Sequence, residues 1–251
     1  MTRTAILITG AGSGIGAAIA RALAAPEVSL LLHTGSNEAA LQAVAAEARA
    51  KGATVETMLG DLTDPALAPA LVETARTRFG GLDKIVSNAG RAQKSQFGEV
   101  TAADLTAAFD MMALAFFRLA DAALPLLRAS REGRIVAISS FVAHAYGTNG
   151  LLFPATSAAK AALEALAKSL AYQLGPDGVT VNCVAPGFVR KDATGHAATT
   201  RATMDSATQI TPNRRIGLPE DIASMVRYLL QPEALHITGQ VFHVDGGLLL
   251  P

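Results

Sequence analysis

Short apolar runs alternate with longer segments of helical period along the whole chain, and this alternation constrains the fold more than any other feature. Seven runs have the length and composition of buried strands, at residues 5–8, 28–32, 55–59, 84–86, 134–138, 179–184 and 240–244. Strands separated by helices in this way form parallel sheets with helices on both faces. The sequence therefore predicts an α/β protein with a doubly wound, seven-stranded parallel sheet.

Length and charge narrow the class of protein further. The 251 residues suit one large domain, and no linker or repeat divides them, so we expect a single domain over residues 1–251. Basic and acidic residues balance at 21 each, without a basic stripe, which argues against nucleic acid or an anionic membrane as partner. No apolar run could span a bilayer, the N-terminus lacks a signal-peptide pattern, and Cys183 is the single cysteine. We expect a cytoplasmic protein whose partners are small molecules or copies of itself.

Proline marks several expected boundaries. Asp64–Pro65 and Leu218–Pro219 each place a cap and an N1 proline before a helix. Pro125, inside the helical pattern of residues 101–129, should kink the helix or restart it. The stretch at about residues 188–212 is polar and irregular, so we expect a mobile substrate flap with short helices over the carboxyl ends of the strands.

A glycine-rich turn follows the first predicted strand directly and leads into a helix that opens at Ala17. Such a turn lets backbone N–H groups approach a pyrophosphate, and the helix N-terminus adds partial positive charge. Because the strand before it and the helix after it supply the required context, the pattern predicts a dinucleotide site over a purely structural turn. The residues of this turn expected to bind the cofactor are Gly10, Ser13, Gly14, Ile15 and Gly16.

The spacing Thr-Gly-x-x-x-Gly-x-Gly resembles the short-chain dehydrogenase/reductase family, and further stretches agree in the family's order along the whole chain. These are Gly60–Asp64, Ser87–Gly90, Asn182–Gly187, Arg215–Asp221 and Gly239–Gly247. The resemblance implies a Rossmann fold and an NAD(P)-dependent oxidoreductase that acts on CH–OH or C=O groups. It also implies that the cofactor contacts Asp61, Leu62, Asn88, Ala89, Gly90, Lys160, Pro186, Gly187 and Val189.

The resemblance fails at the active site. The family's Tyr-x-x-x-Lys pattern corresponds here to Thr156-Ser157-Ala158-Ala159-Lys160, so Thr156 stands at the tyrosine position. In the family the lysine binds the nicotinamide ribose and lowers the pKa of the tyrosine, whereas a threonine hydroxyl is too weak an acid and too short to replace a phenol. Met112 stands where the family usually has an asparagine that supports a proton relay. The family's serine is retained as Ser140.

The loop between Ser140 and Thr156 is three residues longer than is usual in the family, since Thr156 lies 16 positions after Ser140 where 13 is more usual. It contains Tyr146 and His144, either of which could supply the missing proton, with Tyr146 favoured. The alternatives without a catalytic role are that Tyr146 is a partly buried loop aromatic and that His144 is a surface imidazole. The predicted catalytic set is therefore Ser140, Lys160, Tyr146 and Thr156, with a solvated helix lysine as the alternative reading of Lys160.

The end of the second predicted strand bears on the choice of cofactor. An acidic residue there would bind the adenosine ribose and repel a 2′-phosphate, but the sequence has no carboxylate at this place. Donor groups on Thr34, Ser36 and Asn37 favour NADP(H), with NAD(H) as the alternative because no arginine stands beside them. The histidines at positions 33, 196, 236 and 243 show no metal-ligand spacing, so no metal is expected.

Two functional hypotheses follow. The first is an atypical NADP(H)-dependent oxidoreductase that transfers hydride between nicotinamide and a carbonyl or alcohol substrate. The alternative is a catalytically silent dinucleotide-binding protein that acts as a sensor or as an oligomer partner. In either case the resemblance implies a homo-oligomer, a tetramer or dimer, and the apolar end Leu248–Leu250 would suit burial against a neighbour. The sequence does not indicate which substrate is used.

Overall fold

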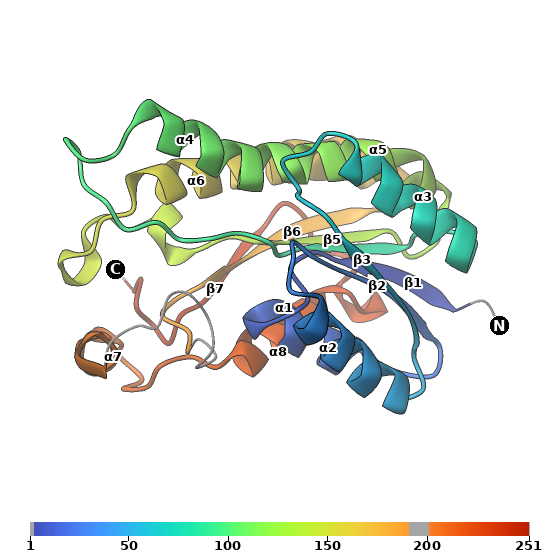
Figure 1. The fold of residues 1–251 in the computed structure, drawn as a ribbon, viewed down its shortest axis with the longest axis horizontal. Coiled ribbons are helices and arrows are strands. Elements are labelled where there is room, and N and C mark those ends of the chain that lie inside the picture. Colours follow the sequence, from blue (N-terminus) through green and yellow to red (C-terminus); the bar gives the residue numbers. More distant parts are fainter. Residues whose placement is uncertain (1–2, 191–200, 251) are drawn as a thin grey trace.

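The computed structural model describes residues 3–190 and 201–250, and these contain a seven-stranded sheet (Figure 1). All its pairings are parallel, and the spatial order is β3-β2-β1-β4-β5-β6-β7. The prediction of a doubly wound parallel sheet is confirmed. The strands are β1 (Thr4–Ile8), β2 (Val28–Thr34), β3 (Thr54–Leu59), β4 (Lys84–Ser87), β5 (Arg134–Ile138), β6 (Thr180–Pro186) and β7 (Val241–Val244).

Helices cover both faces of the sheet (Figure 1). One face carries α1 (Gly14–Leu23), α2 (Glu38–Ala50) and α8 (Pro219–Leu229). The other face carries α3 (Leu67–Phe79), α4 (Ala102–Phe109), α5 (Ala115–Ala129) and α6 (Pro154–Leu174). The remaining helix, α7 (Arg201–Ile210), lies beyond the carboxyl ends of the strands.

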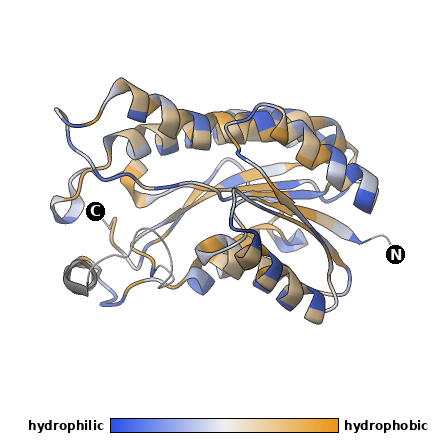
Figure 2. Cartoon of the chain, viewed as in Figure 1, coloured by the Kyte–Doolittle hydropathy of each residue, from blue (hydrophilic) through white to orange (hydrophobic). Residues whose placement is uncertain are grey.

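Alternating side chains of each central strand fill two separate cores. In β1, Ile6 and Ile8 pack with α1, α2 and α8, whereas Leu7 packs with α3, α5 and α6. In β2, Leu30 faces the first core and Leu31 the second. Figure 2 shows largely apolar strands between helices that carry both polar and apolar residues. Because strands buried on both faces offer no surface for chemistry, functional residues must gather at the ends of the strands.

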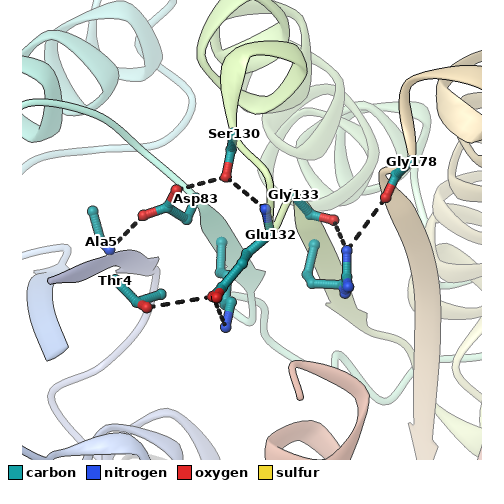
Figure 3. Close-up of polar contacts among 9 residues, drawn as sticks. Thr4, Ala5, Asp83, Ser130, Glu132, Gly133 and Gly178 are labelled. Atoms are coloured by element: carbon teal, nitrogen blue, oxygen red, sulfur yellow. Dashed lines mark hydrogen bonds and ion pairs between the residues drawn. The ribbon is translucent and has the colours of Figure 1, made fainter. Parts of the chain in front are cut away.

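The amino-terminal ends of the central strands are joined by structural polar contacts (Figure 3). Asp83 accepts hydrogen bonds from the backbone N–H of Ala5 at 2.8 Å and from the hydroxyl of Ser130 at 2.6 Å. Glu132 forms an ion pair of 3.1 Å with the buried ammonium of Lys84. These groups are satisfied by one another, and the residues singled out as functional lie at the opposite, carboxyl ends.

Two of the predicted helix boundaries need correction. Helix α3 begins only at Leu67, because the carboxylate of Asp64 accepts the N–H of Ala66 at 2.9 Å and forms a separate turn before the helix. Helix α5 runs through Pro125 to Ala129, so the predicted restart there is wrong. Its buried face holds the helix together on both sides of the proline. The departure from α geometry comes earlier, in a π-helical turn over Asp110–Leu114.

The predicted flap at about residues 188–212 is described only in part. Residues 191–200 lie outside the described part of the chain, and residues 201–210 form helix α7. Before the gap, Val189 forms an isolated parallel bridge with Gly217. No helix within the described ranges is long and apolar enough to cross a membrane.

Candidate active site

The glycine-rich turn between β1 and α1 is held in place by the segment that follows β4. The side-chain amide of Asn88 donates to the carbonyl oxygens of Thr9 at 3.0 Å and Gly10 at 3.1 Å. In return, the hydroxyl of Thr9 accepts the backbone N–H groups of Asn88 at 3.0 Å and Ala89 at 3.2 Å. Asn88, predicted as a cofactor contact, is thus also the support that fixes the shape of the turn.

The glycines of this turn differ in how much room they leave for a side chain. A Cβ atom on Gly16 would lie 2.1 Å from the carbonyl oxygen of Gly10, so this position admits no side chain. A Cβ atom on Gly14 would meet no heavy atom within 4 Å. The first turn of α1 has no acidic side chain, and the side chain of Ser13 makes no capping hydrogen bond. The turn therefore offers a close backbone surface and a positive helix end, which fit a pyrophosphate.

The residues proposed for the adenosine end lie after β2 and β3. The side-chain oxygen of Asn37 caps α2 by accepting the N–H of Ala40 at 3.1 Å, which leaves its amide nitrogen as the donor. Asp61 is exposed, and hydrogen bonds from the backbone and side chain of Thr63 lower the pKa of its carboxyl. Thr34 and Leu62 are half-buried, and Ser36 is exposed. Of these predicted contacts, Ser36, Asn37 and Asp61 are exposed.

His33 is a buried residue of this region to which the sequence assigned no role. Its Nε2 atom lies 3.0 Å from the carbonyl oxygen of Gly60, and its Nδ1 atom has no hydrogen-bond partner among the described residues. Burial lowers the pKa of His33, against the opposing effects of Gly60 and Asp61. The imidazole is therefore held neutral at the end of β2.

Helix α6 places Thr156 and Lys160 one turn apart, both buried. The Lys160 ammonium donates to the carbonyl oxygen of Ile138 at 2.6 Å. Burial lowers the pKa of Lys160 to about 8, and Cys183 and Glu164 oppose this shift. Lys160 is thus not the solvated helix lysine that formed the alternative.

Gly90 and Met112 border the Lys160 side chain. A Cβ atom on Gly90 would lie 3.3 Å from Nζ of Lys160 and 3.4 Å from the sulfur of Met112. The Met112 side chain is buried in the π-helical turn. The oxygen of Thr156 accepts the backbone N–H of Gln93 at 3.0 Å, which ties this same segment to α6. The space beside Lys160 is therefore walled by a glycine, a methionine sulfur and a threonine.

Ser140 follows β5 and is half-buried, with an extended backbone. Its hydroxyl accepts the N–H of Val142 at 3.4 Å, at the start of a short 3₁₀ helix over Phe141–Ala143. This contact is long, so the hydroxyl retains its capacity to bind a substrate oxygen. The neighbouring Ser139 is buried and donates to the carboxylate of Glu164.

Tyr146 and His144, the two proton donors considered in the longer loop, form hydrogen bonds to other groups than Thr156 and Lys160. Tyr146 is 72% exposed rather than partly buried, and its hydroxyl donates to the carbonyl oxygen of Ala143 at 3.1 Å. His144 pairs with Glu164 through Nε2 at 2.9 Å, and its ring meets that of His243 edge-on with centroids 4.6 Å apart. The structure gives neither residue a hydrogen bond to Thr156 or Lys160.

Sequence reasoning missed Glu164 and Gln93. A signal for Glu164 existed, because it stands four residues after Lys160 on the same apolar face of a helix. A carboxylate that is buried on a helix face needs hydrogen-bond donors or an opposite charge as partners. Gln93 contributes only its backbone to the Thr156 contact, and side-chain patterns carry no signal for such a role.

The end of β6 completes this edge of the sheet. Gly187 donates its backbone N–H to Val244 at 3.2 Å, and a Cβ atom there would lie 2.8 Å from Cα of Asp245. Pro186 before it is buried. A hollow of about 390 Å³ opens next to this segment, lined by Arg190, Asp205, Thr208, Arg215, Ile216 and Leu218. Lys191, which follows Arg190 directly in the sequence, lies outside the described residues.

The arrangement matches known proteins in sequence and in structure. A protein-family model described as enoyl-(acyl carrier protein) reductase matches residues 10–249. A short-chain dehydrogenase/reductase from Serratia marcescens has the same fold, with a TM-score of 0.90, 29% identity and coverage of 98% of both chains. The chain belongs to the short-chain dehydrogenase/reductase family. It is accordingly an NAD(P)-dependent oxidoreductase of the kind that acts on carbonyl and alcohol groups.

Two further members of the short-chain dehydrogenase/reductase family are informative. The 3-oxoacyl-[acyl-carrier-protein] reductase of Escherichia coli is 35% identical over 245 residues, which cover 97% of this chain and 96% of the relative. A short-chain dehydrogenase of Burkholderia cenocepacia, solved in complex with NADP, has a TM-score of 0.88 and 31% identity and covers 99% and 98% of the two chains.

Proposed function

We propose that the protein is an atypical NADP(H)-dependent short-chain oxidoreductase that transfers hydride between nicotinamide and a carbonyl or alcohol carbon. The observation that carries this proposal is the buried Lys160, which lies one helical turn after Thr156 and beside Gly90. A buried ammonium is costly unless it serves a partner, so its retention favours a functional role. The site is atypical because threonine and methionine occupy the places of the family's tyrosine and asparagine.

The cofactor half of the site fits a dinucleotide phosphate. When bound, the nicotinamide group supplies or accepts the hydride. The turn at Gly10–Gly16 would hold the pyrophosphate, and Lys160 the ribose next to the nicotinamide. After β2, the hydroxyl and amide donors of Ser36 and Asn37 would bind the 2′-phosphate, with no carboxylate in residues 33–37 to repel it. The Burkholderia cenocepacia relative, solved with NADP, supports this assignment.

The proton needs a route that does not use a phenol. Reduction of a carbonyl adds hydride to carbon and a proton to oxygen, and Ser140 would hydrogen-bond that oxygen. We assign the proton to water held between the hydroxyl of Thr156 and the ammonium of Lys160. Both groups are buried, whereas Tyr146 is 72% exposed and bonded to its own loop. Met112 is apolar and takes no part in the relay.

The relatives indicate which substrates to test first. Because the curated Escherichia coli relative is named a 3-oxoacyl-[acyl-carrier-protein] reductase, 3-oxoacyl thioesters are the first carbonyl compounds to test.

We further propose a homo-oligomer, since Leu114 and Phe117 around the start of α5 are 43% and 49% exposed. Light scattering at micromolar concentration tests this, and a monomer would contradict it.

A fluorescence titration tests the function first. The protein contains no tryptophan, so the emission of the reduced nicotinamide reports binding cleanly. We expect tighter binding of NADPH than of NADH, followed by turnover of a carbonyl substrate that Lys160→Ala abolishes and Tyr146→Phe retains. Full activity in Lys160→Ala would overturn the assignment. NADPH binding without turnover of any carbonyl or alcohol tested would instead identify a catalytically silent protein.

A further inference from the structure

Helix α6 holds the segment of residues 138–144 at three points. Lys160 donates to the carbonyl oxygen of Ile138 at 2.6 Å. One turn later, a single carboxylate oxygen of Glu164 accepts the hydroxyl of Ser139 and contacts Nε2 of His144 at 2.9 Å. Ser140 lies between these anchored positions. The placement of its hydroxyl is therefore set by Lys160 and Glu164 together.

Glu164 is an unusual residue to find in this place. It is 5% exposed and lies on the face of α6 that packs against the sheet. Burying a carboxylate costs several kcal/mol unless hydrogen bonds and opposite charge compensate for the loss of water. Ser139 and His144 supply the hydrogen bonds, and Lys160 one turn away supplies the opposite charge. If this position served packing alone, an apolar side chain would stabilise the fold more than a buried carboxylate does.

The charged and titratable groups that act on Lys160, or that contact or act on its neighbours, come from several elements. Glu164 and Lys168 lie on α6, Cys183 lies on β6, His144 lies on the loop after β5, and His243 lies on β7. Burial raises the pKa of Cys183 to about 12, so this thiol is uncharged at neutral pH. Of the two groups that favour the charged form of Lys160, only Glu164 therefore carries a negative charge there.

We propose that Glu164 is a positioning residue of the oxidoreductase site, which ties Ser139 and His144 to α6, so fixes Ser140, and provides the counter-charge of the Lys160 ammonium. Its effect on turnover rests on the proposed function. Its effects on Lys160 and on the segment of residues 138–144 do not, and they are measurable in the protein without cofactor.

The charge is tested by nuclear magnetic resonance on protein labelled with ¹³C at lysine Cε. The Lys160 resonance is identified by its loss in Lys160→Met, and in the wild type its titration is expected near the pKa of about 8. Glu164→Gln keeps the shape of the side chain and removes its charge. We expect it to lower the Lys160 midpoint by about 1 pH unit. Glu132→Gln, which removes the partner of buried Lys84 at the opposite end of the sheet, is the matched control and should leave Lys160 unmoved.

The positioning role of Glu164 is tested by substitutions of His144, its partner in the segment of residues 138–144. His144→Gln retains a donor for Glu164, whereas His144→Phe does not, and the partly exposed side chain of His144 makes both variants safe for folding. If the wild type is active, we expect Glu164→Gln and His144→Phe to lower kcat about tenfold with little change in the affinity for NADPH. We expect His144→Gln to keep a kcat close to that of the wild type.

The outcomes separate the two proposals. An unmoved Lys160 midpoint in folded Glu164→Gln would overturn the role as counter-charge, whether or not turnover is ever found. If Glu164→Gln does not fold, Glu164→Asp replaces it, and a midpoint near that of the wild type is expected because the charge is kept. Equal kcat values for His144→Phe, His144→Gln and the wild type would overturn the positioning role. A wild type without turnover would count against the proposed function alone, because the Lys160 titration is measured without substrate.

Discussion

The hydroxyl oxygen of Thr156 accepts a 3.0 Å hydrogen bond from the backbone N–H of Gln93. This contact joins α6 to the segment after β4 that also carries Gly90, so it connects the two walls of the space beside Lys160. A threonine hydroxyl accepts and donates at once, and its proton therefore remains available to a neighbour. The short side chain serves as a structural tie and can still take part in the proposed water-linked proton route.

Substitution of Thr156 should separate these two roles. Thr156→Val keeps the shape of the side chain but leaves the Gln93 N–H without an acceptor, which should lower the free energy of unfolding by about 1–3 kcal/mol. Thr156→Ser keeps the hydroxyl and should stay within about 1 kcal/mol of the wild type. Urea unfolding measures both, and turnover should survive only in the serine variant. If the two variants are equal in stability and activity, the contact contributes nothing.

The glycine turn should respond unequally at two neighbouring positions. In Gly16→Ala the new Cβ atom would meet the carbonyl oxygen of Gly10 at 2.1 Å, so the turn must open, and we expect NADPH binding to be lost. In Gly14→Ala the new atom meets nothing within 4 Å, although the positive φ of 52° costs about 1 kcal/mol. Thermal unfolding and NADPH fluorescence measure the difference, and a Gly16→Ala variant that binds as tightly as the wild type would contradict the geometry.

Cofactor preference should change at Gly35. This residue is exposed after the end of β2, and a Cβ atom there would meet no heavy atom within 4 Å, so we expect Gly35→Asp to fold normally. Its carboxylate would repel a 2′-phosphate and accept the ribose hydroxyls, which should weaken NADPH binding at least tenfold relative to NADH, or about 1.4 kcal/mol. Gly35→Asn is the uncharged control. An unchanged ratio of NADPH to NADH affinity would place the phosphate elsewhere.

The stability of the protein should fall in mild acid because of His33. Burial lowers its pKa below the ordinary value of 6.5, so below pH 6.5 the unfolded chain binds a proton that the folded chain does not. Stability is therefore present above pH 6.5 and is lost as the pH falls below it. His33→Gln keeps a donor for Gly60 and does not titrate. Urea unfolding at pH 5 and pH 7 should show a smaller difference in this variant than in the wild type, and equal differences would contradict the prediction.

Sequence patterns alone predict the sheet, the two helical layers and the glycine turn. Apolar runs, helical periods and the glycine spacing are local properties, and the parallel order follows from the alternation of strands and helices. The pairing of Thr156 and Lys160 was equally local, because residues four apart on a helix share a face.

The partners of the polar side chains, in contrast, depend on the folded arrangement of the whole chain. It directs His144 to Glu164 and Tyr146 to its own loop, continues α5 through Pro125, and buries His33 beside Gly60. Each of these outcomes depends on groups distant in the sequence or on packing across a helix, and no local pattern records which of several acceptors a donor will reach. The spacing along the chain indicates which groups are available, whereas folding in three dimensions selects among them.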